Sequence, residues 1–258
     1  MEEILVVENL KKTFPLSAKQ RKAQKTKLRK KVAVDGVSFT AYRGEIFGLL
    51  GPNGAGKTTT LRILSTLIKA DEGDAFVNGK SVRKEPAEVR AQIGFLTSEL
   101  KLEAFFTPDY LFNFFSDLHR VPLNVREERK KFLFEKFGID KYAFTKVGDL
   151  STGMKQKLSL VISIVQDPDI IIFDEPTNGL DVLTARVVTD FLLELKERGK
   201  TIVLSTHIFS LAEKICDRVC VIIDGKVARV DTIAALTAGQ SLEDAFFDIY
   251  REVKGDEE

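Results

Sequence analysis

The residues best suited to chemistry lie between positions 51 and 58, where the chain reads Gly-Pro-Asn-Gly-Ala-Gly-Lys-Thr. The spacing Gly-x-x-x-x-Gly-Lys-Thr is that of a phosphate-binding loop, in which glycines let backbone N–H groups close around an oxyanion. Lys57 can reach the β- and γ-phosphates of a nucleotide, and the Thr58 hydroxyl can bind Mg²⁺. The residues expected to bind the nucleotide are Gly51, Pro52, Asn53, Gly54, Ala55, Gly56, Lys57, Thr58 and Thr59.

A second chemical signal is the stretch 170–176, Ile-Ile-Ile-Phe-Asp-Glu-Pro. An apolar strand that ends in two carboxylates places them at the carboxyl edge of a sheet, beside a phosphate loop on the neighbouring strand. Taken alone, the stretch fits a solvated strand end equally well. Beside the loop at 51–58 it predicts phosphoryl transfer to water, with Asp174 holding Mg²⁺ through water and Glu175 polarising the attacking water.

The elements around these residues predict an α/β fold. Short apolar runs typical of strands occupy 45–50, 169–173, 201–205 and 219–223, and helical patterns occupy 59–64, 184–198 and 209–216. Strands that alternate with helices favour a largely parallel sheet. Two earlier strands are expected at 4–10 and 32–41, and an Asp-Gly turn at 224–225.

Residues 99–165 read as mostly helical. Thr107, Pro108 and Asp109 form a helix start, with a capping hydroxyl, a preset φ and an acid in the first turn. The apolar residues that follow at helical spacing, or add aromatic surface, are Phe105, Phe106, Tyr110, Leu111, Phe112, Phe114, Phe115 and Leu118. They are expected either to pack in the core or to form a docking groove for a partner helix.

The bulk composition narrows the classes of protein. The 258 residues suffice for one sizeable domain or two small ones. Because 39 basic residues meet 38 acidic ones, no overall charge draws the chain to nucleic acid, and no nucleic-acid partner is expected. No apolar run approaches the roughly 18 residues of a membrane span, and the acidic start at 1–4 is unlike a secretion signal, so we expect a cytoplasmic location. Cys216 and Cys220 are expected to be reduced and apolar.

A strongly basic insert occupies residues 19–31, which hold lysines and arginines and almost no apolar side chains. Such a segment is typical of a solvated hairpin tip or a disordered insert. The functional alternative is contact with anionic lipid or an acidic partner surface. Nucleic acid is the weakest alternative, because no aromatic residues are interleaved for base stacking.

The run 150–158, Leu-Ser-Thr-Gly-Met-Lys-Gln-Lys-Leu, resembles the signature sequence of ATP-binding cassette (ABC) ATPases. Its usual form is Leu-Ser-Gly-Gly-Gln; Ser151 and Gly153 are retained, whereas Thr152 and Met154 depart from it. Ser151 can cap a helix whose positive end points outward. The resemblance implies that this helix end binds the γ-phosphate of ATP held by a second subunit.

The same resemblance extends over nearly the whole chain and assigns further residues. It implies that Asp181 communicates between paired sites, that His207 contacts the γ-phosphate and the attacking water, and that Phe14 stacks on adenine, although a core Phe is an equal alternative there. Ser98 stands where the family has a Mg²⁺-contacting glutamine, and its hydroxyl is too short to replace that amide directly. Glu99 is the alternative by analogy.

The resemblance also implies an architecture. We expect a P-loop NTPase with a RecA-like core and an antiparallel β region, interrupted by a helical subdomain at about 98–163. The nucleotide-binding domain would cover 1–240, and a short helix with an acidic tail would cover 241–258. We expect ATP hydrolysis by a dimer, each site combining residues 51–59, Asp174, Glu175 and His207 of one subunit with Ser151 and Gly153 of the other. An integral membrane permease, as a separate polypeptide, would be the partner, with this protein peripheral on the cytoplasmic face.

Within the family, the runs at 93–102 and 105–108 resemble the ATPase subunit of bacterial sodium-extruding ABC exporters, and the tail at 241–247 is similar to one in export ATPases. The same machinery could instead export a drug, a lipid or another substrate. A non-transport ABC ATPase acting on nucleic acid or ribosomes is a second alternative. A P-loop kinase would leave residues 150–158 and His207 unexplained, and a purely regulatory ATP-binding module would leave Glu175 unexplained.

Overall fold

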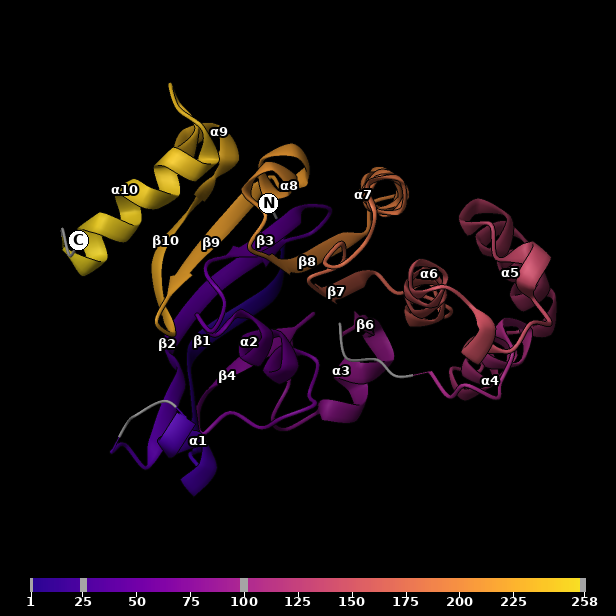
Figure 1. The fold of residues 1–258 in the computed structure, drawn as a ribbon, viewed down its shortest axis with the longest axis horizontal. Coiled ribbons are helices and arrows are strands. Elements are labelled where there is room, and N and C mark those ends of the chain that lie inside the picture. Colours follow the sequence, from indigo (N-terminus) through magenta and orange to yellow (C-terminus); the bar gives the residue numbers. More distant parts are fainter. Residues whose placement is uncertain (1, 24–26, 98–101, 256–258) are drawn as a thin grey trace.

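The computed structural model describes residues 2–23, 27–97 and 102–255 and contains two β-sheets surrounded by helices (Figure 1). The strands are β1 (Glu3–Pro15), β2 (Lys30–Tyr42), β3 (Ile46–Leu50), β4 (Glu72–Val77), β5 (Lys80–Ser81), β6 (Ile93–Leu96), β7 (Ile170–Asp174), β8 (Thr201–Thr206), β9 (Arg218–Ile223) and β10 (Lys226–Thr232). The helices are α1 (Ala18–Ala23), α2 (Lys57–Leu64), α3 (Pro86–Gln92), α4 (Pro108–Leu118), α5 (Leu123–Phe137), α6 (Thr152–Ser163), α7 (Val182–Glu197), α8 (Phe209–Ile215), α9 (Ile233–Leu236) and α10 (Leu242–Lys254), with 3₁₀ turns at Asp140–Tyr142 and Val147–Asp149.

The larger sheet has the strand order β10-β9-β3-β8-β7-β6. Its strands from β9 to β6 run parallel, and β10 pairs antiparallel with β9 through the predicted turn at 224–225. Every residue of β3, β7 and β8 is buried, as expected for parallel strands that are covered on both faces. The predicted parallel sheet is therefore confirmed, and it places the carboxyl ends of β3, β7 and β8 at one edge.

The smaller sheet is antiparallel, with the order β2-β1-β4-β5. Strands β1 and β2 run further than predicted, because they continue through residues 11–15 and 30–31 and pair Phe14 with Lys31 at their far end. The N–H of Asp35 donates to the carbonyl of Gly225, which ties this sheet to the β9–β10 turn. Phe14 and Lys31 are thereby held in a defined strand pair.

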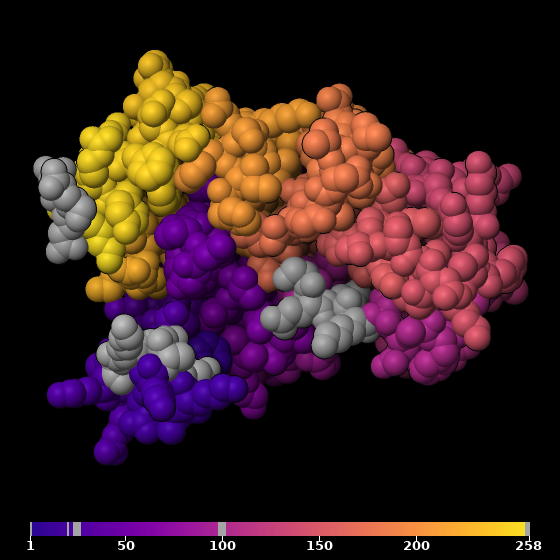
Figure 2. All heavy atoms as spheres, viewed as in Figure 1, coloured from indigo at the N-terminus to yellow at the C-terminus, as the bar shows by residue number. Residues whose placement is uncertain are grey.

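The described part of the stretch 99–165 is mostly helical, as predicted, and α4 to α6 form one end of the molecule, opposite α10 (Figure 2). Thr107 caps α4 by accepting from the Tyr110 N–H. The expected aromatic face is different in detail. Phe112 is fully buried and packs edge-on against Phe134 at 5.5 Å between ring centroids, whereas Leu118 is exposed. Since α4 turns Phe112 toward α5, Phe112 is excluded from any docking surface.

The basic insert contains regular structure that its composition did not predict. Helix α1 covers its first part, and Lys30 and Lys31 already belong to β2. Residues 24–26 lie outside the described part of the chain. The insert therefore joins a short helix to a strand whose pairing with β1 fixes its end.

Both cysteines are buried and free, which confirms the prediction of reduced, apolar side chains. Burial raises the pKa of the Cys216 and Cys220 thiols to about 12. The neutral thiol is favoured because a thiolate would lose its hydration in this apolar core.

Candidate active site

The phosphate loop connects the carboxyl end of β3 to the start of α2. Its glycines are required by close approaches of the backbone. A Cβ at Gly56 would lie 2.3 Å from the carbonyl oxygen of Ala33, and one at Gly51 would lie 2.2 Å from that of Ile222. Gly56 also has a φ of 107°, in the left-handed region that favours glycine. The loop is therefore held tightly between the two sheets.

Lys57 lies at the centre of the loop. Its Nζ donates to the carbonyl oxygens of Gly51 at 2.7 Å and Pro52 at 3.2 Å, and lies 3.5 Å from Glu175 Oε1. Burial lowers the pKa of the Lys57 ammonium, while the Glu175 carboxylate opposes that shift. A phosphate oxygen that binds here would lie beside the positive charge of Lys57, and little water would screen the attraction between them.

Asp174 ends β7 with its carboxylate almost fully buried. Its Oδ1 accepts from the Thr58 hydroxyl at 2.9 Å and from the Ser205 hydroxyl at 2.6 Å. Oxygen donors of this kind, a carboxylate beside a hydroxyl at the phosphate loop, match the preference of Mg²⁺. Two of the residues predicted to serve the metal, Thr58 and Asp174, are therefore adjacent, and Ser205 is an additional hydrogen-bond partner of Asp174.

Glu175 follows Asp174 and lies between Lys57 and His207. Its Oε2 is 2.9 Å from His207 Nδ1, and its N–H donates to the backbone and side-chain oxygens of Ser205 at 3.2 and 3.1 Å. The backbone of Glu175 has a φ of +53°, which costs a non-glycine residue about 1–2 kcal/mol. The end of β7 thus holds the Glu175 backbone in an unfavourable conformation, and the side-chain carboxylate faces the phosphate loop.

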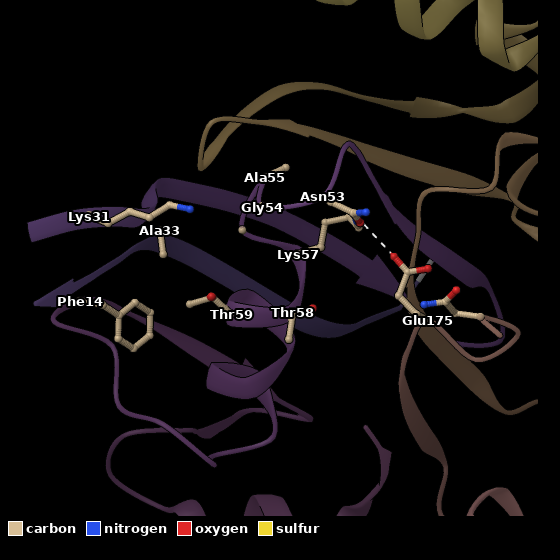
Figure 3. Close-up of a pocket in the computed structure, with 12 residues that line it drawn as sticks. Phe14, Lys31, Ala33, Asn53, Gly54, Ala55, Lys57, Thr58, Thr59 and Glu175 are labelled. Carbon is tan, nitrogen blue, oxygen red and sulfur yellow. Dashed lines mark ion pairs between the residues drawn. The ribbon is translucent and has the colours of Figure 1, made fainter. Parts of the chain in front are cut away.

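The loop and Glu175 line a pocket of about 310 Å³ (Figure 3). Figure 3 shows Phe14 and Lys31 at one end of this pocket and Glu175 at the other, with Lys57 between them. Lys31 and Asn178 also line the pocket and were missed in the sequence, because Lys31 was counted with the basic insert and nothing in the sequence marked Asn178.

The signature residues lie elsewhere. Ser151, Gly153 and Asp181 are not among the described residues that line this pocket. Ser151 caps α6 by accepting from the Met154 N–H at 3.3 Å, as predicted. Asp181 caps α7, and hydrogen bonds led by that from the Thr184 hydroxyl hold the pKa of its carboxyl below the usual value.

The two helix starts lie side by side. A Cβ added at Gly153 would lie 3.4 Å from Thr184 Oγ1 and 3.7 Å from Asp181 Oδ2. Ser151, Gly153 and Asp181 therefore lie close together on one surface, and this surface is separate from the pocket that Lys57 and Glu175 line. Ser98 and Glu99 lie outside the described residues, so the prediction for that position stays a prediction.

A phosphate loop at the carboxyl edge of a parallel sheet, with a strand-end Asp-Glu pair beside it, defines a P-loop nucleoside triphosphatase. Residues 34–178 match the family model described as ABC transporter. The chain belongs to the ABC transporter family, and it is an ATP-binding, ATP-hydrolysing subunit of such a transporter.

Three similar proteins illustrate the relationship. The chain is 37% identical to the ABC transporter ATP-binding protein NatA of Bacillus subtilis, over 82% of this chain and 87% of that protein. It is 39% identical to the Nod factor export ATP-binding protein I of Burkholderia lata, over 76% of this chain and 64% of that protein. A bacterial ABC transporter cassette solved as a dimer matches with a TM-score of 0.77 and 25% identity, over 89% of this chain and 99% of that one. The predicted α/β P-loop fold is confirmed.

Proposed function

We propose that this protein drives export through a separate integral membrane permease, as a peripheral subunit on the cytoplasmic face, and that sodium is the first cargo to test. The observation that carries the proposal is the division of the ATPase site. Lys57 and Glu175 line one pocket, whereas Ser151 and Gly153 lie on another surface. A site divided in this way is completed by a second subunit, and such closure can do mechanical work on a partner.

Each composite site would contain the phosphate loop, Asp174, Glu175 and His207 of one subunit, and Ser151 and Gly153 of the other. The dimeric state of the solved cassette at 25% identity supports this arrangement. Ser151 would present the positive end of α6 to the γ-phosphate. Asp181, which lies beside Gly153, would then communicate between the paired sites, so that one site responds to nucleotide in the other.

Within one site the roles follow from the contacts. Lys57 binds the terminal phosphates, and Thr58 with Asp174 holds Mg²⁺, which neutralises phosphate charge when bound. Glu175 orients and polarises the attacking water, and His207, 2.9 Å from its carboxylate, keeps that carboxylate in place and reaches the γ-phosphate. Phe14 stacks on the adenine ring at the far end of the pocket.

The permease would dock on the helical subdomain, which we place at about 98–163 within a nucleotide-binding domain of 1–240. An apolar pocket of about 200 Å³ lies there, between the chain before α4 and α4 itself. Its lining residues are Leu102, Glu103, Phe106, Tyr110, Leu111, Phe114 and Phe115. Phe105 is 63% exposed and its ring lies 4.3 Å from that of Phe106, so it extends this apolar surface into solvent. A partner helix with apolar side chains fits such a groove.

The cargo rests on weaker support than the machinery. The runs at 93–102 and 105–108 resemble sodium-extruding exporters, and NatA is among the similar proteins. The similarity to a Nod factor export protein favours export in general and keeps a larger substrate as the second candidate.

The test is transport by the purified complex. The protein and the membrane protein encoded beside its gene are reconstituted in vesicles, with the ATP-binding subunit facing the outer medium. ATP should drive radioactive sodium into the lumen, and Glu175→Gln should abolish that uptake. ATP hydrolysis without sodium uptake would reject sodium as the cargo.

Docking is tested with a matched pair of variants. Phe105→Ala should weaken co-purification with the permease and uncouple uptake while ATPase activity of the isolated subunit is kept. Phe144→Ala, at an exposed position of the same helical region, is the control and should change neither. Unchanged co-purification of Phe105→Ala would refute the docking surface.

A further inference from the structure

Lys31, the last residue of the basic insert, lines the nucleotide pocket. Among the described residues that line this pocket, the charged ones are Lys31, Lys57 and Glu175. Figure 3 shows the Lys31 side chain extended toward Gly54 of the phosphate loop. A Cβ built on Gly54 would lie 3.8 Å from Lys31 Nζ. The pocket therefore contains a second ammonium group, which lies beside the loop at the Phe14 end.

Strand pairing fixes the position of Lys31. In the register of β1 and β2, Lys31 lies opposite Phe14. Two residues further along β2, Ala33 also lines the pocket, and its carbonyl oxygen would lie 2.3 Å from a Cβ at Gly56. Because alternate residues of a strand face the same side, Lys31 and Ala33 both face the phosphate loop. The backbone of β2 thus sets Lys31 beside Phe14 and the loop at the same time.

The neighbouring lysines of the hairpin act on a carboxylate instead. Lys12 lies 2.8 Å from Asp71, and its hydrogen bond lowers the pKa of the Asp71 carboxyl. The charge of Lys30 adds to that shift, so Lys30 acts on the side of β2 away from the nucleotide pocket. Lys31 makes no ion pair with a carboxylate in the described part of the chain. Its charge is therefore available to an anion in the pocket.

We propose that Lys31 binds the α-phosphate of ATP and ADP, as a phosphate ligand in addition to Lys57. The inference rests on the position of ATP in the proposed function, with the base at Phe14 and the terminal phosphates at Lys57. In that position the phosphate joined to the ribose is the one nearest the Phe14 end. An ammonium group at this end reaches that phosphate, whereas Lys57 lies further toward Glu175.

The chemistry of lysine suits this role. Its ammonium group is a compact charge with three donors, which can bind a phosphate oxygen from several directions. Lys31 is exposed, so water screens the attraction and the gain in affinity is modest. ATP and ADP share the α-phosphate, so Lys31 should tighten the binding of both to the same degree. Because the contact does not change during hydrolysis, the rate at saturating ATP should not depend on it.

Equilibrium binding of three ligands tests the contact. Lys31→Met removes the charge and keeps an unbranched side chain. Its Kd for ADP and for a non-hydrolysable ATP analogue should both rise about three- to tenfold, because both ligands lose a charge-assisted contact at a partly screened site. Its Kd for adenosine, which has no phosphate, should be unchanged. Lys31→Arg restores the charge and should bind ADP within about twofold of the natural protein.

Lys30→Met is the matched control, because it makes the same change at the adjacent residue on the opposite face of β2. It should leave the Kd for ADP within about twofold of the natural value. Equal losses in Lys30→Met and Lys31→Met would overturn the inference, since only the general charge of the insert would then matter. A loss confined to the ATP analogue would also overturn it, by placing Lys31 at the γ-phosphate. So would an equal loss for adenosine.

Kinetics and salt separate a phosphate contact from a structural role. In Lys31→Met the KM for ATP should rise by the same factor as the Kd, while kcat stays within about twofold. A tenfold fall in kcat would contradict the assignment. The difference in Kd between the two proteins should shrink between about 0.1 and 1 M salt, because the screening length falls from about 10 to 3 Å. A difference that salt does not change would refute a charge contact.

Phe14→Ala separates this inference from the proposed position of the base. If Phe14→Ala weakens adenosine binding while Lys31→Met leaves ADP binding unchanged, only the Lys31 contact is rejected. If Phe14→Ala leaves adenosine binding unchanged, the base lies elsewhere and both proposals fail. Weaker adenosine binding in Phe14→Ala, together with weaker ADP binding in Lys31→Met alone, would support both.

Discussion

Replacing Glu175 by Gln removes one negative charge from the centre of the site and keeps the shape of the side chain. The backbone bonds to Ser205 are untouched, and an amide can still pair with His207. If Glu175 is the general base, the loss should be about 10²–10⁴-fold in kcat, which corresponds to about 2.7–5.4 kcal/mol of barrier. ATP binding should not be lost along with the hydrolysis rate.

The same change should preserve or tighten ATP binding. A phosphate oxygen about 3 Å from Lys57 Nζ, on the side opposite Glu175, would lie about 6.5 Å from Glu175 Oε1, since Nζ and Oε1 are 3.5 Å apart. Two unit charges at that separation repel by about 2.5 kcal/mol at an effective dielectric constant of about 20. Removing the carboxylate relieves this repulsion, so Kd should stay the same or fall by up to about 60-fold.

The assays are phosphate release at saturating ATP and Mg²⁺, and equilibrium binding of a fluorescent ATP analogue. Asp190→Asn is the matched control, because it makes the same carboxylate-to-amide change at an exposed residue of α7 that pairs with Arg186. The control should hydrolyse ATP at the rate of the natural protein. If Glu175→Gln keeps more than half of that rate, Glu175 is not the base. If it loses ATP binding, the carboxylate instead supports the loop.

Three further predictions follow from the contacts. Gly48→Ala should cost about 1–3 kcal/mol in urea unfolding, because its Cβ would lie 2.9 Å from Cys216 Sγ; Cys216→Ala should restore part of this, and equal costs in both backgrounds would refute the overlap. Above pH 9.0 the unfolded chain loses thiol protons that the native chain keeps to about pH 12, so the free energy of unfolding should fall by at most about 1.4 kcal/mol per pH unit for each of Cys216 and Cys220; a Cys216→Ala, Cys220→Ala variant with the same slope would exclude this cause. Phe14→Ala should weaken ATP binding by about 1–2 kcal/mol but leave tripolyphosphate binding unchanged, whereas equal losses for both ligands would argue against base stacking.

Much of this fold was predictable because its signals are local. The glycine spacing at 51–58, the apolar run ending at Asp174 and the cap at Thr107 each depend on residues within one turn or strand. Their element types follow from short-range sterics and burial, which a sequence displays directly. The parallel sheet followed from the alternation of strands and helices.

The missed features depend on which elements become neighbours. Helical spacing placed Phe112 near the predicted aromatic face, and only the packing of α5 shows that it is buried. In the sequence, Lys31 is one of many charges in a basic segment. In the structure, its strand pairing with Phe14 of β1 places it at the nucleotide pocket. In both cases the deciding contact lies with a residue far along the chain.

Ser205 shows most clearly what sequence order hides. Its hydroxyl donates to Asp174 Oδ1 at 2.6 Å and accepts from the Glu175 N–H at 3.1 Å, so one side chain orients both carboxyl residues. This depends on the register of β7 and β8, which sets Asp174 directly opposite Ser205. The same contact holds Glu175 at its positive φ, which would otherwise relax. The neighbouring strand therefore fixes the geometry of the candidate site, and the Asp-Glu pair in the sequence shows only part of that arrangement.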